Sequence, residues 1–473
     1  MHDWCSFIIH YRFIVSQKDL AAIKRLTLLS FPIASLYIMA CSKVFSGDLP
    51  ELLNGIIQFF KNDYKTLRSC ILVNRLLCRL TIPLLWENPF SVIDNFDLGR
   101  KKYQFIEIYL HELNDDDKIK LKEYGINCDL FPSNTLFNYP SFIKYFSTEV
   151  SSISIDEWIE NNKTLPIIEN LTLQIESSHE YFLNNLKNSN CSNTLKVIIL
   201  YEIDFKNIVI FKEVFENLNV LESIHFLYCS SLNSGIIQQI INLTKPFKLK
   251  SLFLNEQPDI LEIVLLQSLL RKTGDYIENI GFKHLISNKL RQQFFELTKN
   301  YCKNIKFFDL LGFDNQNIYL AFDSIKNIRH NLNYLTINLY KFYQFDWEFT
   351  LSSVILFNLG QILPYKLEYL SLSLDDINIF DLEVFFKKSE NTFINKLLIY
   401  NRLHLDSDDI LPCIKNYIMK EKKVRYFAMK SLYPDGKSKD LFSLKDEVKE
   451  FEFYNIIIQN YDSLNIRARN FIM

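Results

Sequence analysis

Three six-residue stretches show the pattern on which this chain is built: LKSLFL at Leu249–Leu254, LNYLTI at Leu332–Ile337 and LEYLSL at Leu367–Leu372. Each reads apolar-x-x-apolar-x-apolar. Successive side chains of a β-strand point to opposite faces, so the fourth and sixth residues of each copy are expected on one buried face and the fifth on the other. One such strand cannot bury its apolar face alone, so the copies must stack on one another.

The pattern recurs eleven times along the chain at a nearly constant step. The fourth positions of the copies lie 24 to 35 residues apart, at Leu171, Ile198, Ile224, Leu252, Ile280, Phe308, Leu335, Leu370, Leu397, Phe427 and Phe451. A chain rich in Leu and Ile gives isolated hexads by chance, but a period of roughly 20–29 residues is the signature of leucine-rich repeats. The copy LESIHFLYC at Leu221–Cys229 resembles the cysteine-containing subtype of that family. The resemblance implies a leucine-rich-repeat solenoid over residues 161–473.

The segments between the hexads carry helical patterns. Apolar residues recur at three- and four-residue spacing in Ile260–Leu270 and Leu290–Leu297. The long step of 35 residues contains a longer connecting segment at Gln344–Pro364. Alternating strands and helices predict an α/β fold. Units of this length are expected to curve into a horseshoe with parallel strands on the concave face and helices on the convex face.

A different pattern occupies residues 48–90, DLPELLNGIIQFFKNDYKTLRSCILVNRLLCRLTIPLLWENPF. Its three apolar stripes predict three short helices, the first beginning at Pro50 and the second capped by Asn62-Asp63. Pro83 is expected to kink or end the third helix. A segment this short makes a marginal core, so part of its apolar surface is expected to need a partner.

This segment resembles the F-box, a domain that binds the Skp-type adaptor of SCF ubiquitin ligases. The resemblance rests on Leu49-Pro50, the apolar run through Phe59-Phe60, the stretch Ser69–Arg75, and Arg79-Leu80 before Trp86. It departs from the family at Leu77, where an aromatic residue is common.

The resemblance places an F-box at residues 39–92. It implies that the adaptor, and through it a cullin, is met by Leu49, Pro50, Leu53, Ile57 and Trp86. The alternative is that most of these side chains only hold the three helices together; for Leu53 and Ile57 the two interpretations carry about equal weight.

Residues 93–160 separate the two patterns and are expected to form a linker and the N-terminal cap of the solenoid, whose end needs covering. The aromatic segment Thr135–Phe146 is expected to pack against the first repeat, and the acidic stretch His111–Lys118 to be solvated.

The sequence offers no constellation for catalysis. It contains no HExxH, GxSxG, Walker A or GxGxxG motif, so no catalytic residue, metal ligand or cofactor is expected. The 53 basic and 55 acidic residues nearly balance, whereas nucleic-acid binding usually shows a basic excess, so no nucleic acid is expected as a partner.

The concave face is therefore the expected place of function. Aromatic side chains on a rigid surface make good interface anchors, and an unknown protein substrate is expected to bind Phe253, Phe307, Tyr334, Tyr369, Tyr426 and His225. The alternative is that the aromatic residues pack sideways against one another as ladders. His225 occupies an outward fifth position, which favours a solvated side chain over a ligand contact.

The nine cysteines are scattered and never spaced as CxxC, which predicts reduced thiols in a cytoplasmic or nuclear protein. Residues 1–38 are expected to be a poorly ordered extension. The apolar run Leu26–Cys41 is short for a membrane span, so no membrane is expected as a partner. The resemblance to the F-box thus implies a non-enzymatic substrate-recognition subunit of a ubiquitin ligase. The alternative is a leucine-rich-repeat interaction scaffold that recruits no ligase.

Overall fold

A computed structural model gives the fold of the chain. It describes residues 50–89, 135–148, 193–206, 208–254, 263–282, 288–311, 317–339, 350–402, 410–421, 423–433 and 435–472, with single residues at 106, 108, 119, 151 and 154. The described residues divide into two compact units: a helical unit, residues 50–89 with 135–144, and a larger unit, the residues from Tyr145 onward with residues 106, 108 and 119, that we call the array.

The helical unit contains the three helices that the sequence predicts, α4 (Pro50–Phe59), α5 (Tyr64–Ile71) and α6 (Arg75–Leu85). Asp63 caps α5 by accepting a hydrogen bond from the Thr66 amide, as expected, and Asn74 caps α6. Pro83 does not end α6, which runs on to Leu85. The three apolar stripes meet in one core made of Leu53, Ile57, Leu67, Cys70, Leu77 and Leu84.

The segment Thr135–Lys144 belongs to this helical unit. Its short helix η3 (Tyr139–Phe142) places the Tyr139 ring 4.2 Å from the Trp86 ring. The Lys144 ammonium lies 2.9 Å from the carboxylate of Glu87, which also pairs with Lys61. A buried carboxylate and a tryptophan ring hold the segment to the helices up to Lys144. That it also covers the end of the array stays a prediction. The last part of the segment forms β1, a strand of the array.

The array contains a single 12-stranded sheet in which the first ten strands lie side by side in chain order. The strands are β1 (Tyr145–Ser147), β2 (Val197–Tyr201), β3 (Ser223–Cys229), β4 (Leu249–Leu254), β5 (Asn279–Phe282), β6 (Phe307–Leu311), β7 (Tyr334–Asn338), β8 (Lys366–Asp375), β9 (Phe393–Arg402), β10 (Val424–Leu432), β11 (Ser438–Asp440) and β12 (Ile457–Ile458). All neighbouring strands pair in parallel except β10 and β11, which are antiparallel. The α/β fold that the sequence predicts is confirmed.

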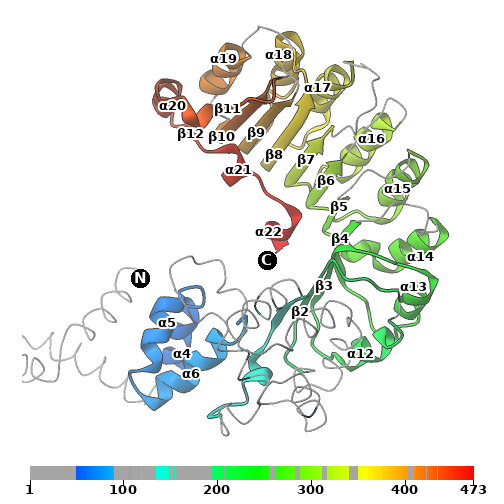
Figure 1. The fold of residues 1–473 in the computed structure, drawn as a ribbon, viewed down its shortest axis with the longest axis vertical. Coiled ribbons are helices and arrows are strands. Elements are labelled where there is room, and N and C mark those ends of the chain that lie inside the picture. Colours follow the sequence, from blue (N-terminus) through cyan, green and yellow to red (C-terminus); the bar gives the residue numbers. More distant parts are fainter. Residues whose placement is uncertain are drawn as a thin grey trace, which may run out of the picture. The chain divides into compact units, whose positions relative to one another are not determined.

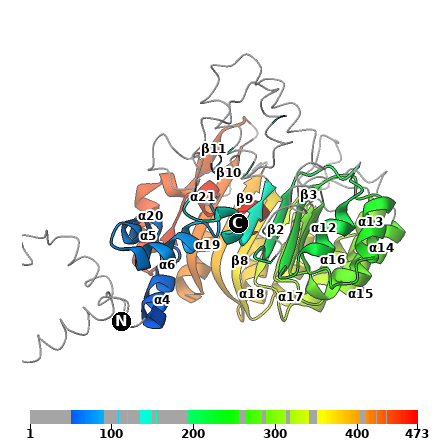
Figure 2. The same cartoon turned by 90° about the horizontal axis from the view of Figure 1, so that it is seen from below.

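Helices follow the strands, and all but the last two lie on one face of the sheet (Figures 1 and 2). They are α12 (Phe211–Asn217), α13 (Ser234–Ile241), α14 (Ile263–Thr273), α15 (Asn288–Tyr301), α16 (Ile318–Ile328), α17 (Thr350–Ile362), α18 (Ile379–Lys388), α19 (Leu411–Glu421), α20 (Lys445–Glu452), α21 (Tyr461–Leu464) and α22 (Ala468–Ile472), with short turns η4 (Gly274–Tyr276) and η5 (Leu441–Ser443). The long step between β7 and β8 contains α17, as expected. Within the array the strands line the inner side of the curve and α12–α19 line the outer side (Figure 1).

The register of the strands follows the hexads. From β4 to β10 the fourth positions pair in one continuous row: Leu252, Ile280, Phe308, Leu335, Leu370, Leu397 and Phe427. Parallel strands exchange regularly spaced hydrogen bonds, so equal hexads separated by similar helices stack without slipping.

The register is offset by two residues between β3 and β4, where Phe226 pairs with Leu252. An offset of two keeps every side chain on its expected face. The irregularity at the end of β3 places Tyr228 at φ +58°, a left-handed conformation that is uncommon for a bulky residue. Its ring contacts those of Tyr201 and Phe253.

The last predicted copy, VKEFEF from Val448, is a helix and not a strand. Leu444, Val448 and Phe451 recur at helical spacing, and Asp446 and Glu447 favour the N-terminus of α20. Phe451 is buried and its ring lies 5.8 Å from that of Phe427. The strand that completes this turn is β12, where Ile458 pairs with Phe427.

Several expectations fall outside the described residues. They are the extension at residues 1–38, the side chain of Leu49, the acidic stretch His111–Lys118 and the first hexad at Ile168.

Candidate functional site

The two faces of the sheet differ in what covers them. Fourth-position side chains meet the helices: the Phe308 ring contacts Phe295 of α15. Third- and fifth-position side chains point the other way, and we call the surface that they form the inner face. Phe307, next in sequence to Phe308, contacts other strands on this inner face.

An aromatic row runs across the inner face. Ring centroids are 5.8 Å apart for Phe253 and Phe307, 6.2 Å for Phe307 and Tyr334, and 6.3 Å for Tyr334 and Tyr369. The rings therefore pack sideways, which is the ladder arrangement that the sequence left open. Recognition of a substrate by these four residues stays a prediction.

Gly281 allows the row to pass β5. It lies between Phe253 on β4 and Asp309 on β6, and a Cβ atom placed there would approach the Asp309 carbonyl oxygen to 2.8 Å and a Phe253 ring atom to 3.0 Å. Asp309 is half-buried on the inner face, and burial raises the pKa of its carboxyl to about 7.

The chain itself covers the aromatic row. Phe253, Phe307 and Tyr369 have at most 1% of their surface exposed. The covering residues belong to α21 and α22 at the end of the chain, where the Phe471 ring lies 4.5 Å from that of Tyr334. The expected docking surface is thus occupied by residues that the sequence did not single out.

His225 is buried, so the expectation of a solvated side chain is wrong. Its Nδ1 atom lies 2.7 Å from the Ser251 hydroxyl, and its Nε2 atom lies 3.2 Å from that of Ser223. Asn279 Nδ2 donates to the Ser251 hydroxyl, so the imidazole ring, the two serine hydroxyls and the amide form one hydrogen-bonded cluster. Burial, with a contribution from Lys250, lowers the pKa of His225 to about 4. His225, Ser251 and Asn279 lie at one level of the sheet, because the offset of two residues between β3 and β4 places His225 beside Ser251. Ser223 precedes His225 by two residues on the same strand.

The contact between Ser251 and His225 has the length of a nucleophile–base pair. Ser251 has no exposed surface, and a histidine with a lowered pKa is a weak base. We assign this cluster a structural role.

Tyr426, the remaining expected substrate contact, is half-buried on β10. The Arg425 guanidinium lies 5.3 Å and the Lys396 ammonium 5.9 Å from its ring centroid. These distances are at the outer range of cation–π contacts.

The helical unit carries a second surface. Leu53 and Ile57, two of the expected adaptor contacts, have at most 1% of their surface exposed and lie in the core. Trp86 is half-buried against Tyr139. The backbone of Pro50 begins α4, but its side chain lies outside the described residues.

Other apolar residues of the unit are exposed: Leu52 and Phe59 on α4, at 53% and 58%, and Leu72 and Val73 after α5, at 83% and 42%. With the half-buried Ile56, Leu52 and Phe59 follow helical spacing along α4. We call these three residues the outer stripe. The sequence already indicated this stripe, because the apolar residues of α4 occupy more than one face of the helix.

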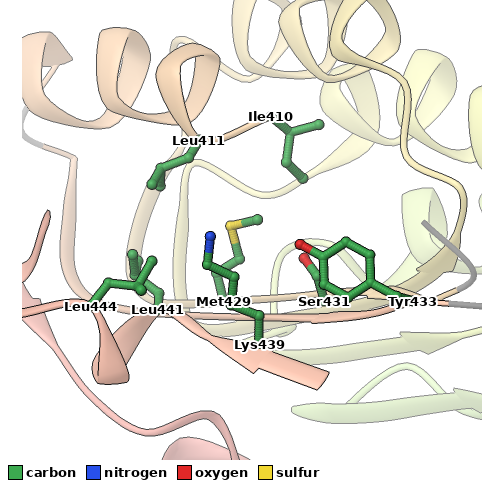
Figure 3. Close-up of a pocket in the computed structure, with 8 residues that line it drawn as sticks. All are labelled: Ile410, Leu411, Met429, Ser431, Tyr433, Lys439, Leu441 and Leu444. Carbon is green, nitrogen blue, oxygen red and sulfur yellow. The ribbon is translucent and has the colours of Figure 1, made fainter. Parts of the chain in front are cut away.

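A small cavity lies beside β10, with a volume of about 40 Å³. Ile410 and Leu411 border it from the α19 side, and Met429, Ser431 and Lys439 border it from the strands (Figure 3). Small-molecule sites usually have volumes of roughly 300 Å³ or more, so this cavity holds water at most.

Within the described ranges, no three or more His, Cys, Asp or Glu side chains gather closely enough to bind a metal ion. No described helix is both long and apolar enough to cross a membrane. The described cysteines are free thiols, and burial raises the pKa of Cys302 to about 12, which makes that thiol unreactive.

Fold and surfaces together define a class: an α/β chain in which a small helical unit with an exposed apolar stripe accompanies an array of parallel strands and outer helices. No protein-family model matches the chain, and no curated protein matches it. The function is therefore argued from the two surfaces.

Proposed function

We propose that the chain is an F-box protein with leucine-rich repeats, and that it serves as the substrate-recognition subunit of an SCF-type ubiquitin ligase. The helical unit binds the Skp-type adaptor and through it a cullin, and the inner face of the array binds a target protein. Ubiquitin transfer takes place on other subunits, so this chain needs no nucleophile, metal or cofactor of its own.

The outer stripe of α4 is the observation that carries the proposal. A helical unit of this size has a small core, and it leaves Leu52 and Phe59 more than half exposed. Exposed apolar side chains aligned on one helix are typical of a docking surface for another protein. In this proposal the outer stripe contacts the adaptor, and Leu53 and Ile57 support the stripe from beneath.

The repeat type is also part of the proposal. The hexads, their spacing and the continuous row of fourth positions support leucine-rich repeats. The free thiols at Cys70, Cys229 and Cys413 support a reducing compartment, the cytoplasm or the nucleus.

An interaction scaffold without ligase recruitment is the second candidate. The burial of Leu53 and Ile57 favours it, because residues expected at an adaptor interface instead form the core of the helices. The two candidates differ in whether the outer stripe binds an adaptor.

Co-purification with a recombinant Skp-type adaptor tests the proposal. We expect the full chain to capture the adaptor, and the double variant Leu52→Ser, Phe59→Ser to lose at least tenfold of that affinity, because each substitution removes an apolar contact that is buried only in the complex.

The matched control is Val264→Ser with Phe380→Ser, two exposed apolar residues on helices of the array, at 66% and 71% exposure. This control should capture the adaptor as well as the unsubstituted chain. Absence of adaptor capture by the unsubstituted chain, with its folding verified by circular dichroism, would overturn the proposal and favour the scaffold.

A further inference from the structure

The last residues of the chain turn back over the inner face. We call residues 460–472 the strap. It leaves β12 and runs along the inner side of the sheet, ending at α22 (Figure 1). Its first part, Tyr461 and Leu464, packs with Tyr369, Leu398 and Ala428. Its last part packs with side chains of the earlier strands β2 to β6, namely Ile199, Leu227, Phe253 and Phe307. The strap therefore crosses most of the inner face.

The start of the strap is fixed by polar contacts. The Asp440 carboxylate accepts hydrogen bonds from the Tyr461 amide at 3.0 Å and from the Asn460 side chain at 3.1 Å. The Lys430 ammonium lies 2.9 Å from the Asp462 carboxylate. Asn460 caps α21 by accepting from the amides of Asp462 and Ser463. This end is tied to β10 and β11.

One hydroxyl sets the register of the middle of the strap. Tyr369 Oη donates to Asn465 Oδ1 at 3.2 Å and accepts from the Ile466 amide at 3.0 Å. A side chain that hydrogen-bonds to both a donor and an acceptor of an extended segment holds that segment in one alignment, as in peptide-binding grooves.

The distal end, Ala468–Ile472, is held by apolar contacts. The Phe471 ring lies 4.9 Å from that of Phe307 and 4.5 Å from that of Tyr334, both in edge-to-face geometry. Ala468 is fully buried. A helix of five residues is unstable alone, so α22 keeps its shape only while it lies on the inner face.

We propose that the inner face is a peptide-binding groove whose resident ligand is the strap. A protein partner binds by displacing the strap from Asn465 onward and by placing an aromatic side chain of an extended segment where Phe471 lies. The inference rests on the proposed role of the inner face as the binding surface, and it is independent of ligase recruitment.

Two features support displacement. Polar contacts anchor the start of the strap, whereas apolar contacts hold its distal end, so the strap can open without leaving the array. The groove is rigid, since the aromatic row is built on paired strands, whereas the strap has no strand pairing beyond β12. A tethered ligand acts at a high effective concentration, so a free segment succeeds only if it binds more tightly or if the strap is weakened.

The probe is a fluorescent synthetic peptide with the sequence of residues 461–473, and the readout is its anisotropy with the full chain. We expect Phe471→Ala in the chain to raise the affinity of the peptide at least tenfold, because the resident ring no longer competes. The same substitution in the peptide should abolish this binding.

Tyr369→Phe in the chain, which keeps the ring and removes the hydroxyl, should weaken peptide binding to the Phe471→Ala chain. Ser463→Ala, at an exposed position of the strap, is the control and should bind as the unsubstituted chain does.

Equal affinity of the unsubstituted and Phe471→Ala chains, with both melting curves showing a folded array, would overturn the inference. Tight binding of the peptide that lacks the phenyl ring would also overturn it. So would a concentration-dependent dimer of the Phe471→Ala chain that blocks the peptide, since a second copy would then be the occupant. Adaptor capture distinguishes the two proposals. If the chain still captures the adaptor but does not bind the peptide, only the proposal of a displaceable strap is overturned.

Discussion

At the scale of single residues, the inner face holds polar groups in an environment that changes their protonation. His225 and Asp309 both lie on this face, and burial favours the neutral form of each. Their shifts have opposite consequences for stability. The pKa of His225 is lowered, so folding becomes less favourable as the pH falls; the pKa of Asp309 is raised, so folding becomes more favourable as the pH falls.

His225 gives a prediction for the pH dependence of stability. Above pH 6.5 the ring is neutral in both states. Between pH 6.5 and about 4 the His225 ring is protonated in the unfolded chain but stays neutral in the folded chain. This difference lowers the unfolding free energy by up to about 3 kcal/mol. We expect the difference in unfolding free energy between the unsubstituted chain and His225→Gln, measured in urea, to shrink by this amount from pH 7 to pH 4.

The two chains must be compared because Asp309, which is present in both, makes the unfolding free energy rise as the pH falls over the same pH range. Its contribution cancels in the difference. His330→Gln, at an exposed site on α16's C-terminal side, is the control and should follow the unsubstituted chain. If the unfolding free energies of His225→Gln and of the unsubstituted chain change with pH in the same way, the assignment of a buried neutral ring is contradicted.

At the scale of elements, neighbouring strands are matched by charge as well as by hydrogen bonds. The second hexad positions alternate in sign from β2 to β6: Lys196, Glu222, Lys250, Glu278 and Lys306. Lys196 pairs with Glu222, and the Glu278 carboxylate lies 3.5 Å from the Lys250 ammonium and 2.9 Å from that of Lys306. Burial alone would raise the pKa of Glu278, but the two lysines outweigh it and lower the pKa.

Reversal of the charge at Glu278 tests this charge ladder. Glu278→Lys places three ammonium groups at the starts of adjacent strands, and we expect it to lower the unfolding free energy by about 1 kcal/mol, since exposed pairs contribute modestly. The loss should shrink in 1 M salt, where screening is strong. Glu296→Lys, at an exposed position of α15, is the control, and a salt-independent loss at Glu278 would contradict the electrostatic explanation.

At the scale of the whole molecule, the helical unit and the array are separate compact units with separate cores. The helical core is small, whereas the strands of the array support one another across the entire sheet. Damage to the helical core is therefore expected to stay local.

Leu53→Ala tests this independence. Removal of a fully buried leucine side chain costs about 2–5 kcal/mol, which is comparable to the stability of so small a unit. We expect hydrogen exchange, followed by mass spectrometry, to lose protection in α4, α5 and α6 while β6, β7 and β8 keep theirs. Leu52→Ala, one residue away but 53% exposed, is the matched control and should leave both regions protected. Loss of protection in β6 to β8 would show that the two units share stability.

The sequence alone determined the repeating strand, its helical connection and most of the register. These features follow from local periodicity: alternation along a strand and near-constant spacing between hexads suffice to align Leu252 with Ile280 and Phe308 with Leu335. The three helices in front were predictable for the same reason, since their apolar spacing is local.

Only the tertiary structure decided what covers the inner face. Tyr369 and Asn465 form a hydrogen bond although they are 96 residues apart, and no local pattern in the strap reveals that contact. The same reason explains the burial of His225, which depends on hydroxyl and amide partners from neighbouring strands, and the helix at Val448, where helical spacing and charge outweighed a strand-like hexad. Periodicity along the chain fixes how each segment folds; contacts between distant segments fix which surfaces remain open.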